Sequence, residues 1–281
     1  MTQQQLAAEF RRLNTAGPHS PLILANAWDC MSARLVEEAG ALAIATTSAG
    51  VSWALGHHDG HGLTRDTMIE AVRRMVQSVR VPVTADVESG YGAGTPDDVA
   101  ETVTRVIEAG AVGVNFEDSP GHGGAKLVDT ANQQSRFASA RAAAKSAGVD
   151  VWINARIDTY LKAVGDDADS RFDETVRRAK AYVAAGADGV FVPLVTDTAT
   201  IERLVAAVGA PLNVLAGPGA PQIETLRALG VARVSVGPWL ARSVMEHIRR
   251  ATNEIMTAGT YDALKTPITS QDANALFAAR P

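Results

Sequence analysis

The sequence contains a single cysteine, Cys30, and no apolar run approaches the roughly 20 residues that a membrane-spanning helix needs. One cysteine excludes an internal disulfide and fits a reducing compartment. Blocks of lysine and arginine are also missing, and the net charge is −5, so nucleic acid and anionic membranes are poorly supported as partners. We therefore expect a soluble cytoplasmic protein without linkers or low-complexity segments.

The 281 residues alternate between short apolar runs and longer stretches of helical period. The runs are rich in Val, Ile and Ala and are apolar throughout, which is typical of parallel strands covered by helices. They predict eight strands, at residues 22–25, 41–46, 81–85, 112–116, 151–155, 189–192, 212–215 and 233–236.

Local signals mark the ends of the helices. Thr95 and Pro96 suit a helix start, where a hydroxyl can cap and proline fills the first position. Glu-Ala-Gly-Ala, at residues 38–41 and again at 108–111, suits a helix end because glycine supplies a left-handed residue. The repeated units predict the α/β class: a (β/α)8 TIM-type barrel over residues 1–281, with about 239–281 as a C-terminal helical extension for oligomer contacts. A doubly wound parallel sheet is the alternative.

Most of the predicted strands end in polar residues. A barrel carries its chemistry at the carboxyl ends of its strands, which makes the polar side chains there candidates: Thr47, Ser48, Asp86, Glu88, Asn115, Glu117, Asp118, Asn154, Arg156, Asp158 and Asn213. Helix capping or loop polarity could explain Asp118 or Asp158 alone. It explains poorly why so many charged groups follow the same ends of the strands.

Three of these carboxylates, Asp86, Glu88 and Glu117, would converge as hard oxygen donors. Crowded carboxylates repel one another unless a cation joins them, and Mg²⁺ suits such a site. Arg156 adds a planar fork for a substrate carboxylate. These groups predict a site for a small anionic oxoacid, in which the metal acts as a Lewis acid. The histidines at residues 57–61 lack the spacing of a zinc site, and the glycine-rich stretches match no nucleotide-binding fingerprint.

Several of these segments resemble the isocitrate lyase and phosphoenolpyruvate mutase superfamily. The resemblance covers residues 22–256 and is strongest in Thr46-Thr47-Ser48-Ala49-Gly50, Leu55-Gly56-His57-His58-Asp59, Ala85-Asp86-Val87-Glu88-Ser89-Gly90-Tyr91-Gly92, Phe116-Glu117-Asp118 and Ile153-Asn154-Ala155-Arg156. It implies a (β/α)8 barrel, usually in a tetramer whose neighbours exchange the last helix. It also implies Mg²⁺, with Mn²⁺ as a possible substitute, and a bound oxoacid.

The resemblance also implies roles for individual residues. The metal would be held, partly through waters, by Asp86, Glu88 and Glu117. Asp59 would contribute without touching the metal, through its waters or its ligands. The substrate would be held by Thr47, the backbone of Ser48 and Ala49, Asp86, Arg156 and, at a more distant carboxylate, Asn213. Arg156 and Glu117 are therefore the expected catalytic groups. Apart from the resemblance, His122 in the loop after the strand at residues 112–116 is the expected proton donor.

Two departures from the family pattern matter. The second metal carboxylate is usually Asp, whereas this chain has Glu88. The loop at residues 119–124 has no cysteine, which serves as the general acid in isocitrate and methylisocitrate lyases. It also lacks the Lys and Asn of the mutases and phosphonate hydrolases, since the nearest lysine, Lys126, is displaced.

These features predict a Mg²⁺-dependent carbon–carbon lyase or decarboxylase. Its substrate would be a small 2-oxo or 2-hydroxy di- or tricarboxylic acid, and the reaction would pass through a metal-bound enolate. The alternatives are a phosphonopyruvate-type mutase or hydrolase and a non-catalytic oxoacid-binding protein. We expect a homo-oligomer, either a tetramer or a dimer.

Overall fold

The structure, a computed structural model of the chain, describes residues 1–15, 21–60, 62–120 and 125–278. Within these ranges nine strands pair into one sheet in which every pairing is parallel, in the order β1-β9-β8-β7-β6-β5-β4-β3-β2. The strands are β1 (Leu22–Leu24), β2 (Asn26–Ala27), β3 (Ile44–Thr46), β4 (Val83–Asp86), β5 (Gly113–Glu117), β6 (Trp152–Arg156), β7 (Gly189–Val192), β8 (Leu212–Leu215) and β9 (Arg233–Ser235). All eight predicted strands are confirmed, with their ends moved by at most three residues.

The sheet closes because β1 and β2 are two parts of one chain segment, separated only by Ala25. β1 pairs with β9 and β2 pairs with β3, so this segment joins the two edges of the sheet. Asn26 bridges the interruption: its Oδ1 accepts from the N–H groups of Val236 (3.0 Å) and Gly237 (2.8 Å), and its Nδ2 donates to the carbonyl of Thr46 (2.9 Å). The predicted (β/α)8 barrel is confirmed, and the doubly wound sheet is excluded.

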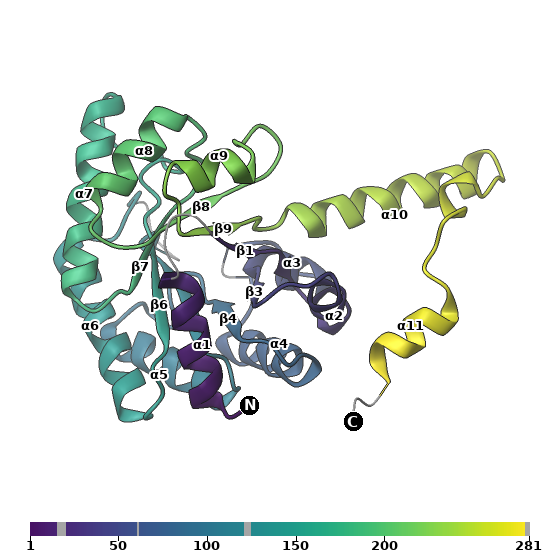
Figure 1. Cartoon of the computed structure of the whole chain (residues 1–281), viewed down its shortest axis with the longest axis horizontal. Helices are drawn as coiled ribbons and strands as arrows, with labels where there is room; N and C mark the ends of the chain where they lie inside the picture. Colours follow the sequence, from purple (N-terminus) through teal and green to yellow (C-terminus); the bar gives the residue numbers. More distant parts are fainter. Residues whose placement is uncertain (16–20, 61, 121–124, 279–281) are drawn as a thin grey trace.

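Most of the helices surround the barrel, and those after the last strand extend away from it (Figure 1). The helices are α1 (Gln3–Thr15), α2 (Cys30–Glu38), α3 (Ser48–Ala54), α4 (Arg65–Ser78), α5 (Pro96–Glu108), α6 (Thr130–Ser146), α7 (Ala168–Ala184), α8 (Thr198–Ala207), α9 (Ile223–Ala228), α10 (Trp239–Thr257), the 3-10 helix η1 (Asp262–Leu264) and α11 (Ser270–Phe277). The predicted helix ends are confirmed. Thr95 caps α5 with Pro96 in its first turn, and Gly110 follows it with a left-handed φ of 95°.

Helix α1, which the sequence patterns did not predict, seals the amino-terminal end of the barrel. Its Phe10 is fully buried beside Gly113 at the start of β5, where a Cβ would lie 2.7 Å from the Phe10 ring. Arg11 forms ion pairs with Asp150 (2.5 Å) and Asp188 (3.0 Å), which precede β6 and β7. This leaves the carboxyl ends of the strands as the open end.

Helix α10 extends outward from the barrel, and the segment with α11 follows it (Figure 1). The carbonyl of Leu276 in α11 accepts a 2.8 Å hydrogen bond from Arg34 of α2. None of the helices in the described ranges is both long and apolar enough to cross a membrane.

Candidate active site

The described residues that were predicted to bind metal or substrate all line one cavity of about 350 Å³ that opens at the carboxyl ends of the strands, whereas the candidates Asp118 and Asn154 do not line it. The predicted residues that line it are Thr47, Ser48, Ala49, Asp59, Asp86, Glu88, Glu117, Arg156 and Asn213. His122 lies outside the described residues. The barrel thus brings these residues together from five strands or the segments after them, as the strand-end argument requires.

Asp86, at the end of β4, is held from two sides. Its Oδ2 accepts hydrogen bonds from the backbone N–H (3.0 Å) and the hydroxyl (2.7 Å) of Ser48, the first residue of α3. Its Oδ1 accepts from the amide of Asn115 on β5 (3.1 Å). Ser48, predicted to hold a substrate carboxylate, therefore positions Asp86 in this structure.

Glu88 has an unusual backbone conformation. Its φ of 50° lies in the left-handed region, which residues other than glycine seldom adopt. The backbone carbonyl accepts a 2.9 Å hydrogen bond from the N–H of Glu117, which ties this turn to the end of β5. A strained backbone that aims a buried carboxylate into a cavity is typical of a functional position.

Arg156 lies between two carboxylates. Its Nη1 is 2.8 Å from Oε2 of Glu117, its neighbour in register on β5, and its Nε and Nη2 donate to Asp158 at 2.7 and 3.1 Å. This double contact fixes the plane of the guanidinium. Burial raises the pKa of Glu117 and the charge of Arg156 opposes this rise, while the charges of Asp158, Asp86 and Glu88 raise the pKa further.

The carboxylates crowd one another in a way that a cation would relieve. Partial burial and then the charge of Asp86 raise the pKa of Asp59 at the rim of the cavity. However, no three His, Cys, Asp or Glu side chains in the described ranges lie close enough together to coordinate one metal ion directly. Hard oxygen donors that are close but not in direct contact fit Mg²⁺, which keeps several of its waters.

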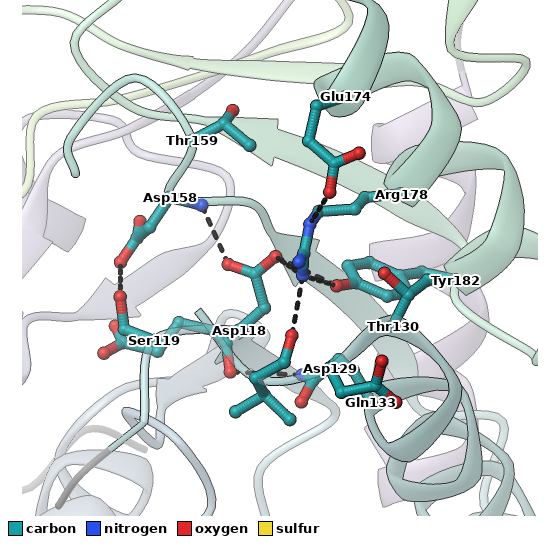
Figure 2. Close-up of polar contacts among 12 residues, drawn as sticks. Asp118, Ser119, Asp129, Thr130, Gln133, Asp158, Thr159, Glu174, Arg178 and Tyr182 are labelled. Carbon is teal, nitrogen blue, oxygen red and sulfur yellow. Dashed lines mark hydrogen bonds and ion pairs between the residues drawn. The ribbon is translucent and has the colours of Figure 1, made fainter. Parts of the chain in front are cut away.

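Behind Arg156, Asp118 joins the base of the loop after β5 to helix α7 (Figure 2). Asp118 is completely buried; its carboxylate accepts from the N–H of Asp158 (2.9 Å), from Arg178 (3.1 Å) and from the Tyr182 hydroxyl (2.9 Å). Its carbonyl accepts from the N–H of Val128 (2.8 Å), whose own carbonyl accepts from Arg178. Asp118 therefore connects the two ends of this loop and holds the backbone of Asp158, the partner of Arg156. It does not cap a helix, which was the alternative explanation for this residue.

Asn213 belongs to a chain of amides across the barrel. Its Oδ1 accepts from Asn154 (3.3 Å), which also donates to Asn115 (3.0 Å). Its own amide donates to the carbonyl of Val214 (2.8 Å) and to the hydroxyl of Ser235 (3.1 Å). Both amide hydrogens of Asn213 are thus bonded within the barrel. Arg233 lines the same cavity, and the search for polar residues at the ends of strands missed it because it stands at the start of a strand.

Comparison with known proteins places this geometry in context. The family described as phosphoenolpyruvate phosphomutase matches residues 10–256. An uncharacterized protein of Mycobacterium tuberculosis (strain H37Rv) is 41% identical over 77% of this chain and 78% of its own length. An oxaloacetate decarboxylase of Ectopseudomonas mendocina is 31% identical (76% and 72%), and a phosphonopyruvate hydrolase of Variovorax sp. is 29% identical (68% and 64%). A crystal structure from Burkholderia cenocepacia J2315, provisionally assigned as a lyase/mutase, is 37% identical with a TM-score of 0.89, covering 99% of this chain and 97% of that one.

Proposed function

Because the chain belongs to the phosphoenolpyruvate phosphomutase family, within the isocitrate lyase/phosphoenolpyruvate mutase superfamily, we propose that it is a Mg²⁺-dependent lyase that breaks a carbon–carbon bond. The proposed substrate is a small 2-oxo or 2-hydroxy di- or tricarboxylic acid. The relative named oxaloacetate decarboxylase supports this substrate class. The observation that carries the proposal is Arg156, a cation fixed by Glu117 and Asp158 inside a cavity lined by further carboxylates.

In the proposed reaction, Arg156 binds and neutralises a substrate carboxylate and so orients the 2-oxo acid. The carbon–carbon bond to the departing carboxylate breaks and CO₂ leaves. The electron pair of the broken bond stays with the remaining fragment and forms the enolate of a pyruvate-type product. That enolate then takes a proton on carbon, and His122 is the proposed donor. Mg²⁺, held by Asp86, Glu88 and Glu117 with Asp59 behind them, would supply Lewis-acid stabilisation of the charge on the 2-oxo oxygen.

A substrate panel tests this proposal. With Mg²⁺, we expect pyruvate to be released from oxaloacetate or methylisocitrate, without inorganic phosphate from phosphonopyruvate. Release of phosphate would instead favour the phosphonopyruvate-type mutase or hydrolase. Tight binding of oxalate without turnover of any of the three would favour a non-catalytic oxoacid-binding protein.

The Asp86→Asn variant is the metal control for this panel. Because a neutral amide is a poorer ligand for a hard cation than a carboxylate, D86N should take up no Mg²⁺ in titration calorimetry and should lose turnover. Asp97, an exposed carboxylate in the first turn of α5, offers the matched control D97N, which should behave as wild type. Metal uptake by D86N equal to that of wild type would contradict the assigned metal site.

The exposed face of α10 supports the further proposal that the protein is a homo-oligomer. Leu240, Val244, Met245, Ile248 and Ile255 are exposed on this helix, and α10 extends away from the barrel (Figure 1). Their spacing places them along one apolar stripe, which a second copy of the chain would cover.

We expect light scattering after size exclusion to give a dimer or a tetramer for wild type. Ile248→Asp should reduce the mass, because it places a charge in the apolar stripe. Asn253→Asp adds the same charge on the opposite face of α10, so it should leave the mass unchanged. A monomeric wild type, or equal masses for wild type and I248D, would contradict the proposal.

A further inference from the structure

Arg233 is a buried cation whose guanidinium faces the Phe10 ring but meets no carboxylate of the described residues. It begins β9, is only 4% exposed, and lines the candidate active-site cavity. Neither Nε nor Nη1 has a hydrogen-bond partner, and the guanidinium forms no ion pair within the described part of the chain. A buried charge without an ion-pair partner is costly, which makes Arg233 a candidate to bind an anion that enters the cavity.

The surroundings of Arg233 make it part of a polar floor to the cavity. Its Cζ lies 5.9 Å from the centre of the Phe10 ring, which closes the barrel from below. Thr84 lines the same cavity, and its buried hydroxyl also has no hydrogen-bond partner. Gly113 lies between this hydroxyl and the Phe10 ring, because a Cβ at Gly113 would be 2.6 Å from the hydroxyl and 2.7 Å from the ring. The Thr84 hydroxyl therefore lies close to Phe10, the residue that Arg233 also faces.

The other cations of this cavity cannot replace Arg233. Arg156 is held by Glu117 and Asp158, and Lys162 is exposed at the rim. Burial lowers the pKa of Arg233 to about 9, against the effect of the Asp86 charge, so the group remains a cation at neutral pH. Asn213 on β8 is the register neighbour of Arg233. It has no free amide hydrogen for an anion, because its two amide hydrogens are donated to the Val214 carbonyl and the Ser235 hydroxyl.

We infer that Arg233, assisted by the Thr84 hydroxyl, binds the distal carboxylate of a dicarboxylic oxoacid whose 2-oxo acid end lies at Arg156 and Asp86. This inference rests on the proposed function and narrows its substrate class to dicarboxylates. A planar guanidinium matches a carboxylate through two parallel hydrogen bonds. The cavity, at about 350 Å³, is large enough for a small diacid.

The test compares two ligands that differ only in the distal carboxylate, 2-oxoglutarate and 2-oxopentanoate. Titration calorimetry of the full chain with Mg²⁺ should show that wild type prefers the diacid by roughly tenfold to a hundredfold, as expected for a charge-assisted hydrogen-bonded pair. Arg233→Met should abolish this preference and leave the affinity for 2-oxopentanoate unchanged. Lys162→Met removes the same charge from the rim and should keep the preference.

Two further variants keep the inference testable if R233M does not fold. Arg233→Lys keeps the charge without the fork and should retain part of the preference, and Thr84→Val should weaken diacid binding while the fold is kept. R233M, where it folds, should unfold at no lower temperature than wild type, because it removes an unpaired buried charge; a clear loss of stability would instead indicate a structural role.

Oxalate separates failure of this inference from failure of the proposed function. If wild type with Mg²⁺ binds oxalate but shows no preference for 2-oxoglutarate over 2-oxopentanoate, Arg233 is satisfied by water and the inference is overturned, while the proposed function stands. If oxalate does not bind at all, the proposed function fails. Equal losses of both oxoacids in R233M would also overturn the distal-carboxylate role.

Discussion

Arg156→Gln is expected to lower kcat/KM for the oxoacid substrate by roughly a hundredfold to a thousandfold, the usual cost of removing a fixed charge that faces the reacting group. The guanidinium is the only cation held by carboxylates within the described lining of the cavity. Its loss leaves Glu117 and Asp158 without their counter-charge and the substrate carboxylate without its fork. Steady-state kinetics on oxaloacetate with Mg²⁺ measures the effect.

Two companion variants separate this effect from a general one. Arg156→Lys keeps the charge but loses the planar contact with Asp158, so its kcat/KM should lie between those of wild type and R156Q. Arg203→Gln removes an exposed arginine that pairs with Asp169 outside the cavity, and it should leave kcat/KM unchanged. Full kcat/KM in folded R156Q would remove Arg156 from the mechanism.

Asp118→Ala is expected to lower the free energy of unfolding by about 3–5 kcal/mol, because it leaves the buried Arg178 and Tyr182 without their shared acceptor. It also removes the side-chain acceptor of the Asp158 N–H (Figure 2). Chemical denaturation followed by circular dichroism measures this loss. A D118A protein as stable as wild type would show that the network contributes nothing to folding.

Asp118→Asn is the matched control, with a pH dependence of defined sign. Burial raises the pKa of Asp118 to about 6 from an ordinary value of 3.8, so the folded state binds the proton more tightly than the unfolded chain. The Asp118 contribution is therefore most favourable below the unfolded pKa and declines as the pH rises towards 6. D118N does not titrate, so its stability relative to wild type should improve as the pH is raised from 4 to about 7. It should also cost much less than D118A, since the amide keeps the shape and an acceptor.

The sequence was sufficient for the features that depend on neighbouring residues. A parallel strand covered by helices is apolar along its whole length, so the run at residues 189–192 predicted β7 without knowledge of its partners. The start of α5 was predicted for the same reason, because Thr95 and Pro96 act within one turn. The barrel then placed Asp86, Glu117 and Arg156 in one cavity, because strand ends share one rim.

Contacts between distant parts of the chain could only be decided by the tertiary structure. Asp118 is 64 residues from Tyr182, and nothing near it in the sequence distinguishes a buried acceptor from a helix cap. Asn26 closes the barrel through Val236, 210 residues away. Arg233 begins its strand, where a charged residue suggests solvent, and only the plug formed by α1 makes that end of the barrel a closed floor. Periodicity and caps act over a few residues, whereas the partners of a buried charge are fixed by which strands and helices meet.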